Sequence, residues 1–434
     1  MTPAHDTVAD SSSLLTRQQW RALGIFAGLF AFVAIVGAAI DRTDYHILIH
    51  ASPYLGSWDP IFTWWTLLPI GVVVIAVVLV RPAAQWSFRR NVFLWFGIAA
   101  SFGLALSRIE GPNGWTKSLF HPYEYYRSVQ LVHGTGDFLR HFNQRVATYS
   151  LHVQGHPPLY VLSMYWLTVV GLPGRGWAAA MTIAVAYSAV IAIAIVVRSM
   201  ADAATAKRLL PLIAIAPTAV WLVTSSDAFY AGVLAWTVAA TVVAIQRSSW
   251  AMGALAGVSC GACLYLSFGM TVPVIVLSAV VVYRRSWRVL VGLVAGCGAV
   301  AIVFSAAGYS WFAGLSEIRR IYAIITSPYR PYWWFVFANV VAIGSVIGPV
   351  PWLGLVELRD RRVRPLLIGA AVCIAVADVS GLALGEVERI FLPFGTWLMV
   401  GALGMAISVR HTRLGVAIQG TLAIVLGVMI RTVF

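Results

Sequence analysis

The chain has 434 residues, of which 60% are hydrophobic and only 11% are charged, and its formal net charge is +14. A mean hydropathy of +0.83 is too high for a water-soluble domain, whose surface needs many more charged side chains. The composition therefore excludes soluble folds and indicates an integral membrane protein.

Apolar stretches long enough to cross a bilayer as helices recur along the chain. Residues 1–20 are polar and are predicted to form a disordered cytoplasmic N-terminus. The first apolar stretch is too long for a cleaved signal peptide and is predicted to be a retained signal anchor. Residues 21–434 are predicted to form one all-α transmembrane domain with about thirteen crossings, at 21–40, 61–80, 91–106, 177–197, 209–224, 229–245, 251–268, 270–283, 289–308, 334–355, 365–384, 390–409 and 415–430.

Most of the 30 basic residues fall in the cytoplasmic loops of this arrangement, as the positive-inside rule requires. The net charge therefore reports orientation and contact with anionic membrane lipids, and it gives no indication of nucleic-acid binding. Residues 157–171 are also apolar, but counting them as a crossing would invert every later loop. Because the stretch is short, we predict a re-entrant or interfacial helix there.

The longest outer loop, 107–156, is predicted to be the catalytic loop. Its middle part, 123–145, has apolar residues at helical spacing, which predicts amphipathic helices on the membrane surface. Carboxylates near a membrane are costly and are usually kept for a function. Most acidic residues lie on the predicted outer side: Asp41, Asp44, Asp59, Glu110, Glu124, Asp137, Asp227, Glu317, Glu386 and Glu388.

Several outer segments resemble motifs of the GT-C superfamily of membrane glycosyltransferases. The loop carries Glu124 among tyrosines 123, 125 and 126 and is followed by H-P-P-L. The segment APTAVWLVTSSDAFYAG places Asp227 where that superfamily has its second acidic motif. GEVERIFLPF and SPYRPYWW resemble motifs of actinobacterial members. The resemblance covers about residues 91–410, and it departs from the family in having Tyr123-Glu124 where an Asp-Glu pair is usual.

The resemblance implies transfer of a sugar, usually with inversion, from a polyprenyl-phosphate donor to a glycan, glycolipid or protein acceptor. The reaction would take place outside the bacterial cytoplasmic membrane. A carboxylate would take the acceptor proton, and cations would stabilise the leaving phosphate. Glu124 and Asp227 are the predicted catalytic residues. The predicted substrate-binding residues are Tyr125, His156, Arg330, Glu386, Glu388 and Arg389, with both glutamates orienting Arg389.

Other interpretations stay open from the sequence. Glu110, Asp41 and Asp44 are alternatives to Glu124 as the base. Asp227 is also in a good position to cap the next helix. His152 and His156 have the spacing of metal ligands, but no metal site is predicted, and a divalent cation is left open as a cofactor. A transporter or lipid flippase, or a scaffold for envelope assembly, are the alternative functions.

Overall fold

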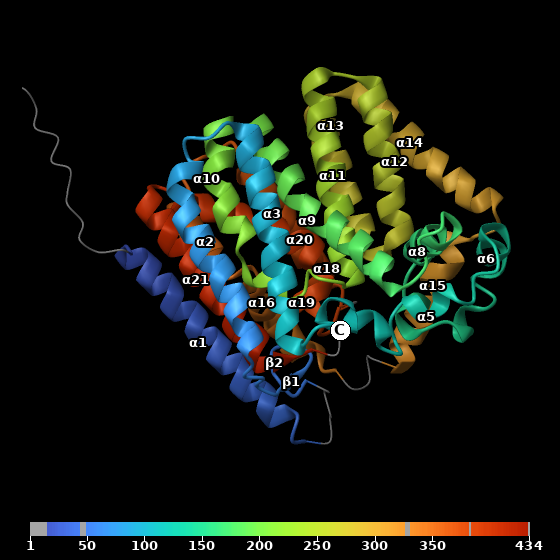
Figure 1. Ribbon diagram of the computed structural model, residues 1–434. Coiled ribbons are helices and arrows are strands. Elements are labelled where there is room, and N and C mark those ends of the chain that lie inside the picture. Colours follow the sequence, from blue (N-terminus) through green and yellow to red (C-terminus); the bar gives the residue numbers. More distant parts are fainter. Residues whose placement is uncertain (1–14, 44–48, 326–329, 382, 433–434) are drawn as a thin grey trace, which may run out of the picture.

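The computed structural model describes residues 15–43, 49–325, 330–381 and 383–432, and these residues form an α-helical bundle (Figure 1). Within them, seven helices are long and apolar enough to cross a membrane, or eight if one bent pair counts as a single crossing. This confirms an all-α polytopic membrane protein. The seven are α1 (Arg17–Ile40), α2 (Leu67–Ala83), α3 (Phe88–Ser107), α9 (Arg175–Met200), α11 (Ser226–Arg247), α14 (Trp287–Ala306) and α21 (Val409–Met429).

The other predicted crossings are short or interrupted helices. Helix length alone therefore does not support all thirteen predicted crossings. The stretch 209–224 consists of α10 (Ala203–Ala214) and the 3-10 turn η5 (Pro217–Val220), because the backbone is extended at Ile215 and Ala216. The stretch 334–355 is bent by 93° between α16 (Tyr332–Ile347) and α17 (Pro349–Glu357). Gly348 has a φ of +82° there. The remaining helices of this kind are α12 (Trp250–Leu266), α13 (Thr271–Tyr283), α18 (Arg364–Val379) and α20 (Leu392–Leu398), which continues as the 3-10 helix η7 (Met399–Met405).

The predicted disordered N-terminus is wrong for residues 17–20, which belong to α1. Thr16 accepts a hydrogen bond from the backbone N–H of Gln19, and the Gln19 side chain accepts one from the backbone N–H of Thr16. This capping box satisfies two backbone donors at the helix start. Residues 1–14 of the prediction lie outside the described residues.

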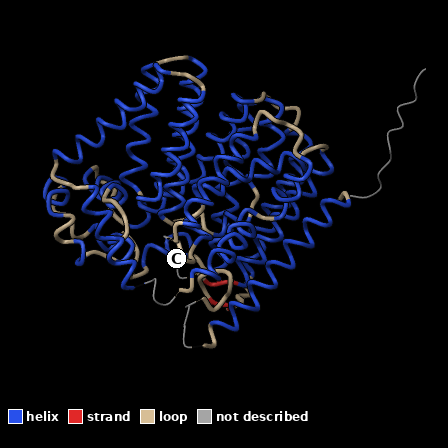
Figure 2. The backbone as a smooth tube through the Cα atoms, turned by 180° about the vertical axis from the view of Figure 1, so that it is seen from behind, coloured by secondary structure: helices blue, strands red, loops and turns tan. Residues whose placement is uncertain are grey.

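The two ends of the bundle carry different segments of the chain (Figure 1). The turns α2–α3, α9–α10 and α17–α18 meet at one end, where Lys207 donates to the carbonyl of Ala84 and Arg362 pairs with Asp202. We call this the arginine-rich end. Residues 107–156 lie at the opposite end, the long-loop end. Figure 2 shows there the two short antiparallel strands β1 (Ser57–Trp58) and β2 (Ile430–Arg431).

The long loop contains several short helices. They are α4 (Gly114–Lys117), α5 (Tyr126–Val129), α6 (Thr135–His141) and α7 (Leu151–Gln154), with the 3-10 turns η2 (Arg108–Glu110), η3 (Ser118–Phe120) and η4 (Val146–Thr148). Gly134, a residue type that disfavours helix, lies between α5 and α6 and is the N-cap of α6. Val129, Phe138 and Phe142 are buried, as their spacing predicts.

The following apolar segment forms α8 (Leu159–Val169), which has 11 residues. At 1.5 Å per residue it rises about 16 Å, roughly half of a hydrocarbon core of about 30 Å. Its length therefore favours the predicted interfacial or re-entrant helix. One further helix, α15 (Trp311–Ile325), lies beside the long loop, where Asn143 donates to the carbonyl of Ser310.

Helices α12 and α14 pack against each other through glycines. Gly253 and Gly257 of α12 face α14, and Gly292 and Gly296 of α14 face α12. A Cβ added at any of the four would lie closer than 3.0 Å to backbone atoms of the other helix. Small residues four apart allow such close approach between helices in a membrane.

We expect Gly296→Leu to destabilise the protein by about 3 kcal/mol or more, because the side chain would overlap backbone that cannot move aside. Gly298→Leu is the matched control, since a Cβ at Gly298 of the same helix meets nothing within 4 Å. Thermal unfolding of both variants in detergent is the measurement. Equal unfolding temperatures for the two variants would contradict the close α12–α14 contact.

Candidate functional site

Glu124 lies in the turn between η3 and α5 at the long-loop end. Its backbone N–H donates to the carbonyl of His121, and its side chain is only 1% exposed. Oε1 lies 3.1 Å from Nδ1 of His152. Burial raises the pKa of Glu124, but the His152 hydrogen bond and the charge of Arg389 outweigh burial and hold it below its ordinary value. Glu124 is therefore a buried carboxylate in its charged form.

His152 joins Glu124 to a second charged group. It lies on the one-turn helix α7 and is 9% exposed, and its backbone N–H donates to the carbonyl of Tyr123. Its Nε2 lies 3.3 Å from Nη2 of Arg389. A guanidinium can only donate, so Nε2 must accept from Arg389. Nδ1 faces the Glu124 carboxylate, so the proton on Nδ1 is donated to Glu124.

Arg389 is the centre of this cluster. It lies on the short helix α19 (Val387–Ile390) and is 4% exposed. Nη1 donates to Oδ2 of Asp227 at 2.7 Å, and Nη2 donates to Oε2 of Glu386 at 2.6 Å. Burial lowers the pKa of Arg389, but the negative charges of Asp227 and Glu386 raise it above its ordinary value. The guanidinium thus stays charged because its partners are buried with it.

Asp227 lies in the first turn of α11, where the helix dipole favours a negative charge. The alternative interpretation of Asp227 as the helix cap is wrong. Ser225 is the N-cap, and its hydroxyl accepts from the backbone N–H of Ala228 at 3.2 Å. Asp227 is therefore left to pair with Arg389.

The loop that carries Glu386 is held by two other side chains. Nη1 of Arg330 donates to the carbonyl of Leu384 at 2.6 Å and lies 3.5 Å from Oε1 of Glu386. Asn339 of α16 donates to the carbonyl of Ala383 at 2.6 Å. Burial raises the pKa of Glu386, but Arg389 and Arg330 lower it to about 2. Both arginines thus fix this carboxylate.

Tyr125 and His156 lie next to the cluster in an aromatic group. The ring centroids of Tyr125 and His156 are 5.7 Å apart, and the Tyr125 hydroxyl accepts from Tyr230 at 3.0 Å. Nδ1 of His156 lies 2.8 Å from the carbonyl oxygen of His152. This nitrogen is therefore engaged with the backbone and is not directed at a metal site shared with the His152 ring. The described residues contain no group of three or more His, Cys, Asp or Glu side chains that could hold a metal ion.

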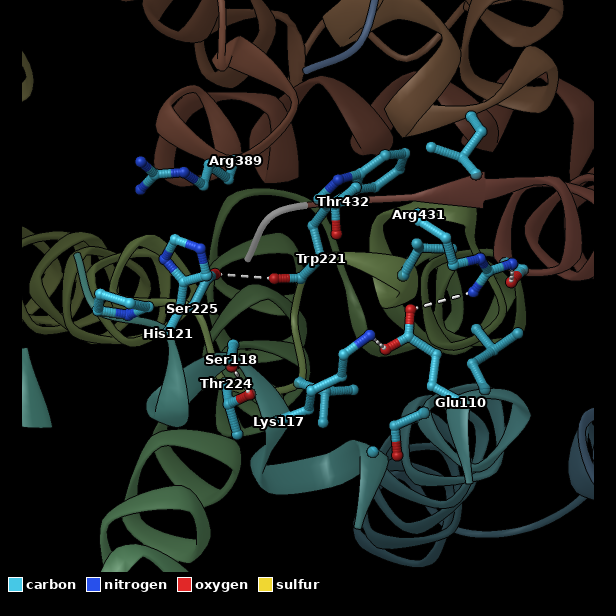
Figure 3. A pocket seen from close by; sticks show the side chains of 18 residues that line it. Glu110, Lys117, Ser118, His121, Trp221, Thr224, Ser225, Arg389, Arg431 and Thr432 are labelled. Atoms are coloured by element: carbon cyan, nitrogen blue, oxygen red, sulfur yellow. Dashed lines mark hydrogen bonds and ion pairs between the residues drawn. The ribbon is translucent and has the colours of Figure 1, made fainter. Parts of the chain in front are cut away.

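A cavity of about 340 Å³ opens beside the cluster (Figure 3). Arg389 lines one side of it, and Glu110, Lys117 and Arg431 line the opposite side. Glu110 pairs with Lys117 at 2.6 Å and with Arg431 at 3.0 Å. The guanidinium of Arg389 is already paired with Asp227 and Glu386. Lys117 and Arg431 share the single carboxylate of Glu110, so this side of the cavity favours an anion.

The structure brings most of the predicted site residues together. Glu124, Asp227, Glu386 and Arg330 are linked directly or through one residue to Arg389. Glu388, which was also predicted to orient Arg389, makes its hydrogen bond elsewhere: its Oε1 accepts from the backbone N–H of Leu55 at 2.9 Å.

Among the alternative bases, Glu110 is held by two cations at the cavity, and Asp41 lies 2.8 Å from His50. Asp44 lies outside the described residues.

Three residues of the site were not predicted from the sequence: His152 as the link to Arg389, and Lys117 and Arg431 as cavity cations. Lys117 offered a signal, because it is one of only two lysines in the chain and lies in the long loop. Arg431 offered none, since it follows the last apolar stretch, where an arginine is ordinary.

The buried Glu388 makes stability depend on pH. Burial raises its pKa from 4.5 to about 7, so the folded state binds this proton more tightly than the unfolded state. The free energy of unfolding should then fall by up to about 3 kcal/mol as the pH rises from about 4.5 to about 7. We expect Glu388→Gln to remove this loss, so that its melting temperature rises relative to the wild type between pH 5 and pH 8. Glu317→Gln, at a half-buried carboxylate on α15, is the control. Parallel curves for Glu388→Gln and the wild type would contradict the account.

The sequence matches no protein-family model and no curated protein. The likeness to GT-C glycosyltransferases therefore rests on the motifs of the chain itself. What the site does has to be argued from its geometry and charge.

Proposed function

We propose that this protein is a GT-C-type glycosyltransferase of the bacterial cytoplasmic membrane. It moves a sugar from a polyprenyl-phosphate donor to a glycan, glycolipid or protein acceptor of the envelope. The long-loop end faces outward in this proposal, and the chain crosses the membrane about thirteen times.

The observation that carries the proposal is the convergence of distant segments on Arg389, beside a cavity that Lys117 and Arg431 also line. Residues 124, 152, 227 and 386 come from three separate parts of the chain, and each bonds to Arg389 or to a group that does. Arginine and lysine side chains are the usual partners of phosphate oxygens. The cavity volume also lies within the range of small-molecule sites.

The surroundings of the cavity suit a lipid donor. Trp58, Phe62 and Trp64 are exposed and lie close in sequence to Asp59, whose carbonyl accepts from Nε of Arg431. Exposed tryptophans at a helix end are typical of the membrane interface. A polyprenyl chain could therefore lie along this apolar surface while its phosphate occupies the cavity.

Glycosyl transfer also needs a group that takes the proton of the acceptor hydroxyl. The buried pair Glu124–His152 is adjacent to Arg389 and supplies this capacity. The leaving phosphate would be stabilised by Arg389, Lys117 and Arg431. All the required groups lie at one end of the bundle.

A transporter usually shows its binding site in a broken helix at mid-membrane depth. The bend at Gly348 is such a break, but Gln419 fills it by donating to the carbonyl of Ile347 at 2.9 Å. A Cβ at Gly348 would overlap Gln419. The break is thus occupied by protein, and we retain the glycosyltransferase.

The test is analysis of envelope glycans and glycolipids in a strain that lacks the protein. We expect one sugar linkage to be missing and wild-type protein to restore it. Glu124→Gln and Asp227→Asn should lower transfer by about 10²- to 10⁴-fold, and Lys117→Ala should weaken donor binding by about tenfold or more.

Glu317→Gln is the control at equal expression, because the half-buried Glu317 pairs with Arg320 of its own helix α15 and does not line the cavity. An envelope with every linkage intact, together with glycolipid accumulating on the cytoplasmic side, would contradict the proposal. That result would identify a transporter or flippase instead.

A further inference from the structure

A second cavity lies at the arginine-rich end of the bundle, opposite the site at the long-loop end. It is an open hollow of about 360 Å³ between the end of α17 and the start of α18. We call it the arginine hollow, and its lining residues are Val356, Glu357, Leu358, Arg359, Arg361 and Arg364. The volume lies within the range of small-molecule sites. Because three of the six lining residues are arginines, the chemistry of the hollow suits a phosphate group.

The carboxylates around the arginine hollow are engaged with other groups. Asp360 binds Arg362, which does not line the hollow, with oxygens 2.8 Å from Nη2 and 3.0 Å from Nε. Asp202 pairs with the same guanidinium at 3.0 Å. Oε1 of Glu357 accepts from the Thr16 hydroxyl at 3.0 Å. Among the described residues, no carboxylate lies within ion-pair distance of the three arginines of the hollow. Three positive charges therefore line it against the single negative charge of Glu357.

An exposed apolar stripe of α18 begins at the arginine hollow. Arg364 is the first residue of α18, and further residues follow at spacings of three or four, which places them on one helical face. They are Ile368, Val372, Val376 and Val379, and each is between 43% and 66% exposed. At 1.5 Å per residue the stripe extends about 22 Å from Arg364, more than the roughly 15 Å of one hydrocarbon leaflet. A lipid with its phosphate in the hollow could lay an acyl chain along this stripe, whereas a soluble phosphate compound would gain nothing from it.

We propose that the arginine hollow binds the phosphate of an anionic phospholipid. Arg359 and Arg361 donate to the phosphate oxygens, for which the fork of a guanidinium is well shaped. Arg364 is positioned by the protein, since its Nη2 donates to the carbonyl of Leu358 at 3.1 Å. The acyl chains lie against the exposed face of α18. This lipid site is separate from the proposed glycosyl transfer and does not depend on it.

A specific site has to bind better than exposed arginines elsewhere, because anionic lipids are attracted to any arginine near a membrane surface. The turn between α13 and α14 offers the comparison. Arg284 and Arg288 are exposed there and do not line the arginine hollow. Arg359 and Arg361 are exposed as well. Replacing either pair by glutamine removes the same charge, so only the hollow distinguishes the two double variants.

The test is lipid binding to the full chain in detergent, measured by native mass spectrometry with phosphatidylglycerol and phosphatidylcholine as probes. We expect the wild type to retain one phosphatidylglycerol under conditions that remove phosphatidylcholine. The double variant Arg359→Gln and Arg361→Gln should bind phosphatidylglycerol about tenfold more weakly or worse, because two charge-assisted contacts are lost. The control Arg284→Gln and Arg288→Gln should keep the wild-type affinity.

Unfolding temperatures without added lipid check that both double variants are folded, and we expect them to match the wild type because all four side chains are exposed. Equal phosphatidylglycerol affinities in the two double variants would overturn the inference, since the hollow would then bind no better than any exposed pair of arginines. Glycerol 3-phosphate is the soluble probe. If it displaces phosphatidylglycerol from the wild type at equal concentration, the lipid is the wrong ligand and the hollow belongs to a soluble phosphate compound.

Discussion

A guanidinium that is 4% exposed is the constraint on which the rest of this site depends. An isolated charge at such a position would be prohibitively costly, so the chain has to bring compensating groups to it. Asp227 from α11, Glu386 beside α19 and His152 from the long loop do this. Because these groups lie far apart in the sequence, pairing with Arg389 fixes the long loop against the transmembrane helices.

The same pairing accounts for the chemistry we propose. Arg389 has the buried cluster on one side and the cavity with Lys117 and Arg431 on the other (Figure 3). It is therefore the group through which an anion in the cavity can influence Glu124 and His152. Trp58, Phe62 and Trp64 near β1 are exposed, and under the proposed function this apolar surface is where the lipid donor would approach.

Much of this arrangement follows from sequence patterns, and the rest depends on tertiary contacts. Hydropathy predicts the membrane helices, because a spanning helix needs a long apolar stretch whatever it packs against. It does not predict the interruptions at Ile215 and Gly348, where local backbone conformation ends the helix inside an apolar stretch. Acidic motifs predict Glu124, Asp227 and Arg389 individually. The link through His152 was missed because its two partners lie 28 and 237 residues away. The bond of Glu388 to the backbone N–H of Leu55 was missed because the two residues lie 333 residues apart.

The most direct test of the account is the coupling between Arg389 and Asp227, measured by thermal unfolding of Arg389→Met, Asp227→Asn and the double variant. Each single change leaves a buried group without its partner, whereas the double change removes both charges. The account predicts that the double variant is destabilised by clearly less than the sum of the two single variants, with a coupling energy of about 2 kcal/mol or more. Strictly additive effects would show that the two residues do not depend on each other and would contradict the central role of Arg389.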